Sequence, residues 1–453
     1  MIEPQRIAVV GSGIAGIAAA WLLGKWHSVW MFERNRYFGG HTHTVTVTEQ
    51  GQTLPIDTGF IVYNEPNYPH LTGLFNHLGI ATRETEMTFA ASVGNPVIEF
   101  AGSDLNTLFA QRRNLVNGGF LGMVWDILRF NRRCKALLRE HRFGNLTVGD
   151  LLEQERLGVR FRDHYLLPMA AAIWSCPPRT MLDFPAQSFA RFFENHGLLD
   201  LYDRPQWKTV VGGSHSYIKR LLEEIGPRAR LADAAVSVSR KKDRIEVTLA
   251  SGERMTFDQV VLACHADEAL ALLTGPLTNE QSILSRFDYQ PNRALLHTDE
   301  RLMPRSRRVW SSWNYLAEQD GAQVEAVSVT YWMNRLQGIR SEREFFVSLN
   351  PLREPRPDRL IAEMTYHHPV FDTGAMAAQQ RLAEIQGLDR IWYTGSYFGY
   401  GFHEDALRAS VELAEGFGIR APWVSRRGRA AWRGPCNERP APVLLYPRPP
   451  PSV

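Results

Sequence analysis

Apolar and polar positions follow a distinctive order at the start of the chain. A short run of β-branched and small apolar residues, Ile7–Val10, leads into a glycine-rich turn and then into a long apolar stretch, Ala15–Leu23. A second apolar run, Val29–Phe32, ends at Glu33. Apolar runs of this length, divided by glycine, predict a buried strand, a tight turn, a helix and a second buried strand.

The turn has the spacing of a dinucleotide-binding motif, Gly11-x-Gly13-x-x-Gly16. In such motifs the first glycine makes the tight turn, the second lets a pyrophosphate approach the backbone, and the third lets helix and strand pack closely. The N-terminus of the following helix attracts the phosphates. Glu33 has the place of the carboxylate that binds ribose hydroxyls, which disfavours the 2′-phosphate of NADP. A glycine-rich turn that binds nothing is the alternative interpretation.

Later parts of the chain show the period-two alternation that predicts strands. Such segments lie in two groups, one before and one after residue 275, and they are Ala235–Val238, Arg244–Leu249, Ala326–Trp332 and Phe345–Leu349. From residue 424 on, arginine and proline dominate, and this segment is predicted to be disordered because it has little apolar surface to bury.

Composition narrows the choice of function. The 453 residues are enough for two or three domains, and the formal charge of +3 is too small to indicate nucleic-acid binding. The chain enters its first strand at once and has no apolar run long enough to cross a membrane, so we expect a cytoplasmic protein without a signal peptide. Widely spaced cysteines argue against zinc and disulfides, and no histidine or carboxylate spacing predicts a metal site; the cysteines are Cys134, Cys176, Cys264 and Cys436.

Segments at both ends of the chain carry a resemblance to a known family. Gly39-Gly40-His41-Thr42 follows Glu33, an Asp-x-Gly turn ends at Gly59, and Ile391–Ser396 precedes a glycine-rich loop and a helix-like run to Phe417. In these motifs the chain resembles the flavin amine oxidase and phytoene desaturase superfamily of FAD-dependent oxidoreductases. His41 stands where this family usually has arginine, and Ser396 where it commonly has an acid.

The resemblance implies FAD as the cofactor. For Glu404 and Asp405, capping of the last helix is an equally good interpretation. The residues implied in FAD binding are Gly11, Gly13, Ile14, Ala15, Gly16, Glu33, Arg34, Gly39, Gly40, His41, Thr42, Gly59, Val236, Gly395, Ser396, His403, Glu404, Asp405 and Ala406.

The resemblance also implies an α/β fold with two domains, as in amine oxidases. A discontinuous Rossmann-type FAD-binding domain is expected from residues 1–85, 205–275 and 385–423. A mixed α+β substrate domain is expected from residues 86–204 and 276–384, first helical and then richer in strands.

Candidate catalytic residues come from the same comparison. Tyr397, Phe398 and Tyr400 match the loop that forms an aromatic cage in the amine oxidases, and Arg293 stands near their lysine. His368 is a further polar candidate, although a lone histidine is more often structural. The turn Trp174–Pro178 could form a wall of the pocket, and Cys176 is a minor candidate for a nucleophile or a covalent flavin link. Aromatic residues of the substrate half could line a dry pocket or form core: Phe184, Phe189, Phe192, Phe193, Trp207, Trp310, Trp313, Tyr331 and Trp332.

The pattern most resembles a bacterial subgroup of predicted NAD/FAD-binding proteins that is associated with the modification of unsaturated fatty acyl chains. This resemblance implies hydride transfer from a lipid-like substrate to flavin, in desaturation or isomerisation. Two alternatives stay open: an amine oxidase that releases hydrogen peroxide, and a lipid-surface binding protein with structural FAD. A second glycine motif for NADPH is absent, and the electron acceptor is not predicted.

A basic amphipathic segment spans residues 120–142. Phe120, Val124, Ile127, Cys134 and Leu138 recur at helical spacing, with basic residues towards the other side: Arg129, Arg132, Arg133, Lys135 and Arg139. An ordinary surface helix is the plainer interpretation. The alternative is a helix that lies on the inner, anionic face of the membrane, with Leu121 or Trp125 inserted.

Overall fold

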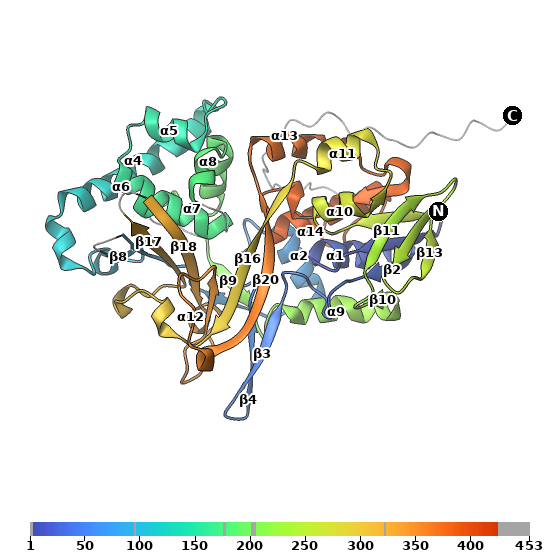
Figure 1. Cartoon of the computed structure of the whole chain (residues 1–453), viewed down its shortest axis with the longest axis horizontal. Coiled ribbons are helices and arrows are strands. Elements are labelled where there is room, and N and C mark those ends of the chain that lie inside the picture. The colour runs from blue at the N-terminus through green and yellow to red at the C-terminus, as the bar shows by residue number, and fades with distance from the viewer. Residues whose placement is uncertain (1–2, 95–96, 175–177, 201–204, 321–322, 425–453) are drawn as a thin grey trace.

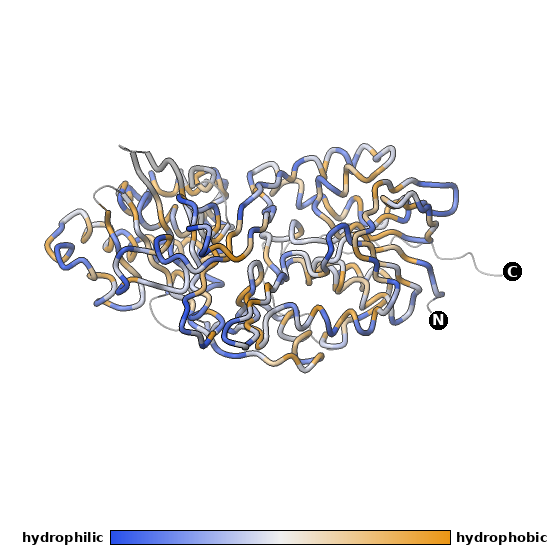
Figure 2. Tube along the Cα trace, turned by 60° about the horizontal axis from the view of Figure 1, so that its bottom comes forward, coloured by the Kyte–Doolittle hydropathy of each residue, from blue (hydrophilic) through white to orange (hydrophobic). Residues whose placement is uncertain are grey.

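The computed structural model describes residues 3–94, 97–174, 178–200, 205–320 and 323–424. These residues form two bodies that lie side by side, with the N-terminus at the outer end of one of them (Figure 1). Hydrophobic stretches of the chain run through the interior of each body, and hydrophilic stretches lie along its outside (Figure 2). The Arg/Pro-rich segment, predicted to be disordered from residue 424, lies outside the described residues from 425 on.

The first body is built on a parallel sheet of five strands in the order β10-β2-β1-β14-β21. Helix α1 (Ile14–Leu23) is buried at all ten positions, between this sheet and the helices α9 (His215–Ile225) and α14 (His403–Gly416). The sheet confirms the predicted strand, turn, helix and strand, and its strands are β1 (Arg6–Val10), β2 (Ser28–Phe32), β10 (Ala229–Arg230), β14 (Gln259–Leu262) and β21 (Ile391–Tyr393).

A second sheet of the same body has the order β13-β12-β11-β15. Its strands are β11 (Ala235–Arg240), β12 (Ile245–Leu249), β13 (Arg254–Phe257) and β15 (Leu273–Thr274), and α10 (Ala266–Leu272) packs beside it. Helices α11 (Thr278–Leu284) and α13 (Thr373–Arg381) bury their apolar residues in the same core. The sequence predicts both helices in the substrate domain, whereas their apolar residues pack in the core of the first body.

The second body contains a sheet of seven strands in the order β20-β16-β19-β18-β17-β7-β8, in which only the β17–β7 pair is parallel. The strands are β7 (Phe89–Val93), β8 (Ile98–Ala101), β16 (Asp288–His297), β17 (Trp313–Asp320), β18 (Gln323–Trp332), β19 (Phe346–Leu349) and β20 (Leu360–Val370). Helices α4 to α8 lie together at one end of this sheet, with α4 and α6 at the outer end of the molecule and α7 and α8 nearer the first body (Figure 1). The helices of the second body are α3 (Leu105–Leu108), α4 (Gly118–Glu140), α5 (Val148–Gln154), α6 (Val159–Phe161), α7 (Leu167–Trp174) and α8 (Ala186–Asn195).

The chain passes between the bodies through smaller elements. A hairpin of β3 (Thr44–Glu49) and β4 (Gln52–Asp57) and helix α2 (Pro69–Leu78) follow the first βαβ unit. Strands β5 (Tyr63–Asn64), β9 (Trp207–Val210) and β6 (Thr82–Thr85) then form a small sheet, and the chain continues from β6 into β7.

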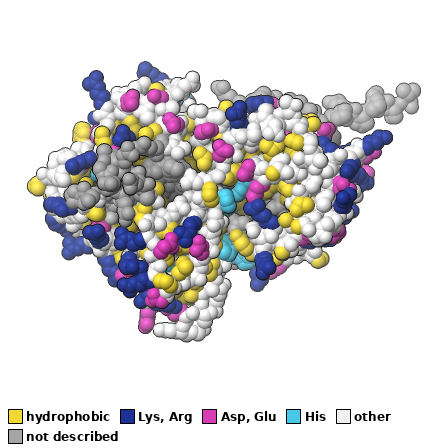
Figure 3. Space-filling view, in the orientation of Figure 1, with side chains coloured by type: hydrophobic (Ala, Val, Ile, Leu, Met, Phe, Trp, Pro, Cys, Tyr) yellow, Lys and Arg dark blue, Asp and Glu magenta, His cyan; other side chains and the backbone are white. Residues whose placement is uncertain are grey.

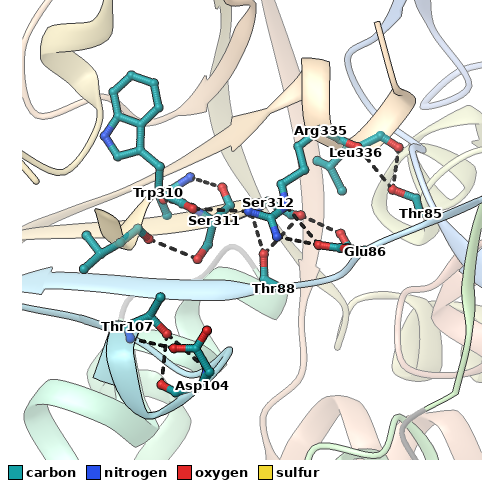
Figure 4. A network of polar contacts seen from close by, with 12 residues as sticks. Thr85, Glu86, Thr88, Asp104, Thr107, Trp310, Ser311, Ser312, Arg335 and Leu336 are labelled. Atoms are coloured by element: carbon teal, nitrogen blue, oxygen red, sulfur yellow. Dashed lines mark hydrogen bonds and ion pairs between the residues drawn. The ribbon is translucent and has the colours of Figure 1, made fainter. Parts of the chain in front are cut away.

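Polar contacts fix this passage from β6 to β7 (Figure 4). Thr85 Oγ1 donates to the Leu336 carbonyl (2.7 Å) of α12 (Met333–Gln337), and Glu86 forms an ion pair with Arg335 of the same helix. The Ser312 N–H donates to Thr88 Oγ1 (3.0 Å) just before β17. The segment that enters the second body is therefore held by α12 and by the residue that precedes β17.

A buried carboxylate joins three elements of the first body. Glu280 of α11 is fully buried, pairs with Arg240 of β11 (2.5 Å), and accepts hydrogen bonds from Tyr393 of β21 (2.5 Å) and from the Leu277 N–H (2.8 Å). The Arg240 side chain is only 18% exposed. A buried ion pair of this kind is costly to break, because one charge is left uncompensated.

We therefore expect Glu280→Gln to lower the free energy of unfolding by about 3–5 kcal/mol in urea titrations. The matched control is Glu223→Gln, which removes the exposed partner of Arg220 and should change stability by less than about 0.5 kcal/mol. Equal effects of the two substitutions would contradict this account.

Candidate active site

One continuous cavity of about 750 Å³ runs between the two bodies. Its first part is lined by the glycine motif, by Glu33 and Arg34, and by Val236 of β11. Its second part reaches the seven-stranded sheet and the helices α7 and α8, and is lined by apolar residues such as Ile173 and Phe192. Histidine side chains gather at the junction of the two bodies on the face shown in Figure 3.

The glycine motif forms a cradle whose three glycines have different reasons to be glycine. Gly11 has φ of +100°, and a Cβ there would lie 2.8 Å from the Ala263 carbonyl oxygen. A Cβ on Gly16 would lie 1.9 Å from the Gly11 carbonyl oxygen, so Gly16 is a packing residue and does not line the cavity. A Cβ on Gly13 would meet nothing within 4 Å and would enter the cavity. This open space in front of a helix N-terminus suits a pyrophosphate.

Glu33 is held at the edge of this cradle. Its carboxylate accepts from Ser12 Oγ (2.6 Å), from the Ser12 N–H (2.9 Å) and from the Asn35 N–H (2.8 Å), which fixes its orientation and leaves acceptor capacity for a ribose hydroxyl. Arg34 also lines the cavity and pairs with Glu268 (2.6 Å).

Residues of the second glycine pair continue the same wall. Gly39, Gly40 and His41 line the cavity, as do Ile14 and Ala15 at the start of α1. Gly59 is required by a close approach, because a Cβ there would lie 2.1 Å from the His41 carbonyl oxygen. Thr42 is the exception among these candidates: it lies behind the wall, where its hydroxyl is hydrogen-bonded to Tyr217 (2.7 Å).

The start of α14 closes the cradle from the other end of the chain. Gly395, Ser396, His403 and Ala406 line the cavity. The His403 ring stacks on Phe60, with 3.9 Å between ring centroids. The last helix and the opening turn therefore face one space.

Two acids of α14, Glu404 and Asp405, do not line the cavity, which corrects their assignment as cofactor ligands. Glu404 accepts from the N–H groups of His70 (2.8 Å) and Leu71 (3.0 Å) at the start of α2, and Asp405 accepts from the N–H groups of Tyr400 (2.9 Å) and Phe402 (3.1 Å). Both carboxylates serve to cap backbone N–H groups.

His41 is a half-buried, neutral group in the position where the family pattern has arginine. Burial and the neighbouring imidazoles, His368 first among them, lower the pKa of His41 well below its usual value. Its Nε2 atom is buried and has no hydrogen-bond partner among the described residues. An unpartnered polar atom in a cavity wall fits a ligand that supplies the partner, and the cradle as a whole fits a dinucleotide.

The comparison with protein families decides which dinucleotide this is. The sequence model of the family described as flavin containing amine oxidoreductase matches residues 14–345, well over half of the chain. The chain belongs to this family. It is an FAD-dependent oxidoreductase, and the glycine cradle, Glu33 and the start of α14 are the parts that would hold FAD.

Solved structures support the two-domain fold, which is confirmed as amine-oxidase-like. A putrescine oxidase bound to putrescine has a TM-score of 0.65 and 15% identity, over 91% of this chain and 98% of that one. A CLA-producing fatty acid isomerase from P. acnes and a cyclohexylamine oxidase from Brevibacterium oxydans IH-35A each have a TM-score of 0.64 and 14% identity, over 92% of this chain and 99% of theirs. Comparison with curated protein sequences gives no match.

The three aromatic candidates for a cage do not surround the cavity together. Tyr397 lines it, Phe398 packs against the core of the first body, and Tyr400 lies at a small neighbouring cavity beside Asn67. Trp174 packs against Phe192, with 4.7 Å between ring centroids, and so stands behind the wall. Cys176 lies outside the described residues.

Arg293 also lies outside the cavity, which corrects its assignment as a catalytic residue. Its guanidinium is on the surface, in ion pairs with Glu354 (2.7 Å) and Glu363 (2.9 Å). The neighbouring Asn292 is fully buried and points to the opposite side of β16, as the period of a strand requires.

Asn292 fixes the proton of His368, which lines the cavity. The Arg293 N–H must donate to Asn350 Oδ1 (2.9 Å), so Asn350 Nδ2 donates to Asn292 Oδ1 (2.6 Å). Asn292 Nδ2 is then the donor to the Gln290 carbonyl (3.1 Å) and to His368 Nδ1 (2.9 Å).

Because His368 Nδ1 accepts this hydrogen bond, the ring proton is on Nε2. Burial lowers the pKa of His368 to about 4, and the nearby His265 and His367 add to the effect. His368 is therefore a neutral imidazole at neutral pH, with an N–H to donate on the side away from Asn292.

The far end of the cavity is formed by an aromatic row that sequence reasoning named only in part. Phe89 of β7, Trp313 of β17 and Tyr331 of β18 are directly paired across neighbouring strands, and all three line the cavity. Of the aromatic candidates named above, Phe192 and Trp207 also line it, whereas Phe184, Phe189, Phe193, Trp310 and Trp332 form core. The residues missed are mostly single aliphatic or sulfur-containing side chains: Met87, Met169, Ile173, Leu198 and Leu349.

Gly13→Val tests the cradle without disturbing the fold. The backbone at Gly13 has φ of −61°, which any residue adopts, and a Cβ there meets no atom. We expect FAD binding, measured by quenching of flavin fluorescence, to be lost while the far-ultraviolet circular dichroism of the protein is unchanged. Gly102→Val, also in open space, is the control. Unchanged FAD affinity in the Gly13 variant would contradict the assignment.

Buried neutral histidines predict an acid-labile fold. Burial lowers the pKa of His196 and His368 to about 4 and that of His403 to about 3. The unfolded chain binds protons at these groups below about pH 6.5, whereas the folded chain does not. The free energy of unfolding should therefore fall as pH decreases from about 6.5 towards 4, by up to about 1.4 kcal/mol per pH unit for each histidine.

The measurement is urea unfolding at several pH values. His368→Gln should reduce the slope of stability against pH by about one proton between pH 6 and 4.5. His141→Asn, at an exposed position after α4, should leave the slope as in the wild type. A slope of zero in the wild-type protein would show that these histidines titrate freely in the fold.

Proposed function

We propose that this oxidoreductase takes a hydride from a hydrophobic, unsaturated fatty acyl or lipid substrate, in desaturation or isomerisation. The observation that carries the proposal is the chemistry of the second part of the cavity. Among the residues that line it in the described parts of the chain, the carboxylates are Glu33 and Glu268, and both belong to the dinucleotide part. A cationic amine would be without a counter-charge beside the apolar wall, and burying such a charge is costly.

The wall itself is suited to an alkyl or alkenyl chain. Met87, Phe89, Ile173, Trp313 and Leu349 come from five different elements or loops and face the same space. Such a surface gains free energy by burying methylene groups and keeps water away from the reacting carbon. When bound, FAD supplies the acceptor for a hydride from an allylic C–H bond.

Polar groups of the wall have an orienting role in this proposal. His368 is a neutral N–H donor, so it can hold a carbonyl or a cofactor heteroatom but is a weak general base. His196 is also neutral and is engaged through Nδ1 with the Phe192 carbonyl (2.9 Å). The position of the C–H bond relative to the cofactor, rather than a strong base, is then the main catalytic demand on the protein.

The solved structures that resemble this chain include enzymes named for fatty acids and enzymes named for amines, so the fold alone does not choose between these two substrate classes. The CLA-producing fatty acid isomerase and the putrescine oxidase share it at similar TM-scores, so the lining of the cavity has to discriminate. No lysine is among the described residues that line the cavity, and Tyr397, Phe398 and Tyr400 do not surround it together; both are arguments against ordinary amine oxidation.

The test is anaerobic mixing of the FAD-loaded protein with unsaturated phospholipids, free unsaturated fatty acids, putrescine or cyclohexylamine. We expect an acyl substrate to bleach the flavin absorbance and the amines to leave it unchanged. Ile173→Trp, which narrows the apolar part, should slow this bleaching by about tenfold or more, as for the loss of a well-placed substrate contact.

Leu388→Trp, at a position 38% exposed and remote from the cavity wall, is the control for Ile173→Trp. Bleaching by an amine alone would replace the proposal with amine oxidation. Failure of every substrate to reduce the flavin, together with unchanged double-bond positions in the recovered lipids, would favour a lipid-binding protein with structural FAD, because an isomerase returns the hydride and leaves the flavin oxidised. Masses of the lipid products would distinguish desaturation, which lowers the mass by two hydrogens, from isomerisation, which leaves it unchanged.

A further inference from the structure

We propose that the outer end of the second body docks on the surface of an anionic membrane. The docking face consists of the 3₁₀ turn Arg112–Val116, the outer side of α4 and the start of α6. It lies at the end of the molecule farthest from the N-terminal body (Figure 1). Its apolar members are unusually exposed: Leu115 51%, Val116 88%, Leu121 42%, Trp125 62%, Leu128 39% and Val159 63%.

Helix α4 carries two apolar stripes, and only one of them is used in the core. Phe120, Met123 and Phe130 are among the buried residues of the inner stripe. Leu121, Trp125 and Leu128 follow each other at steps of four and three residues, which places them on one outer face of the helix. A surface helix that needed only to cover the core would carry polar residues there.

The turn and α6 extend the stripe into a patch. Asn117 accepts a hydrogen bond from Arg160 (3.1 Å), and Asp126 accepts one from the Gly158 N–H (2.9 Å), so Val159 is held beside the outer face of α4. Contiguous exposed apolar surface of this kind marks an interaction site.

Charge complementarity identifies the occupant. Residues 105–133 contain five arginines and one acid, which is Asp126. The Asp126 side chain is 14% exposed and is engaged with Gly158 and with Arg129 (3.4 Å), so the exposed charge of the patch is positive. Apolar side chains surrounded by arginines fit the interface of an anionic bilayer, where the rings and alkyl groups enter the headgroup boundary and the guanidinium groups meet phosphates.

The docking face lies on the outer side of the helical layer that forms one wall of the cavity. Helix α4 packs on α8 and α6, and the chain runs from α6 through the π-helical turn Arg162–Leu166 into α7. Ile173 of α7 and Phe192 of α8 form the inner side of the same helical layer and line the cavity. Docking would thus bring the helical wall of the cavity next to the lipid. In the described part of the chain no helix is long and apolar enough to cross a membrane, so the contact proposed is peripheral.

The experiment is co-sedimentation of the FAD-loaded, full-length protein with vesicles. We expect binding to vesicles that contain phosphatidylglycerol, weaker binding at high salt, and little binding to pure phosphatidylcholine. Trp125→Ser should weaken binding by about tenfold or more, since one large apolar side chain no longer inserts. Arg132→Glu, a change of two charges, should weaken it by about thirtyfold.

Control positions that match Trp125 and Arg132 lie on the first body, away from the docking face. Trp26 is 55% exposed there, and Arg254 is exposed on β13, so Trp26→Ser and Arg254→Glu should bind vesicles as the wild type does. All four positions are on the surface, and unchanged thermal unfolding would show that each variant is folded.

Several results would overturn the proposal. They are equal binding to both kinds of vesicle, equal loss in patch and control variants, or a dimer in sedimentation velocity that Trp125→Ser dissociates, which would make the patch an interface between two copies of this chain. The readout is binding alone, so it stands or falls independently of whether the flavin is reduced by an acyl substrate.

Discussion

The structure depends on the close approach of three backbone segments: the turn at Gly11, helix α1 and helix α14. The Gly11 carbonyl oxygen occupies the space where a side chain on Gly16 would be, so the helix begins in contact with the turn that precedes it. On its other side α1 meets α14, where Ser410 Oγ donates to the Ala15 carbonyl (2.8 Å). Residues almost four hundred positions apart in sequence thus form one cradle. The cofactor site exists only when both ends of the chain are folded.

The second body is attached to this cradle through strands rather than through a flexible linker. Strand β16 and strand β20 pair over their whole length and run from the junction into the seven-stranded sheet (Figure 1). His368 and Asn292 lie on these two strands, so the polar groups at the junction are set by sheet register. The cavity is therefore shaped by both bodies at once, with the glycine cradle at one end and the aromatic row of Phe89, Trp313 and Tyr331 at the other.

Sequence reasoning reached the cradle because its requirements are local. Glycines at fixed spacing, an acid at a strand end and a helix after the last strand are all dictated by backbone chemistry within short segments. It failed at Arg293, because a shift of one residue along a strand turns a side chain to the other face: Asn292 is buried and Arg293 is on the surface. It also failed at α11 and α13, whose place depends on long-range packing.

The His41 and His368 side chains where the two bodies meet are uncharged, whereas the charged side chains of Arg293 and its partners lie on the surface. Burial keeps the imidazoles of His41, His368 and His403 uncharged, and the ion pairs of Arg293 lie outside the wall. A neutral N–H donor polarises a ligand without needing a counter-ion, so it is compatible with an apolar surface nearby. A lysine or arginine in its place would require a carboxylate in the same space. The Asn350–Asn292–His368 chain of hydrogen bonds thus provides polar orientation without charge, and this explains how one cavity can combine a dinucleotide cradle with a wall suited to an uncharged alkyl chain.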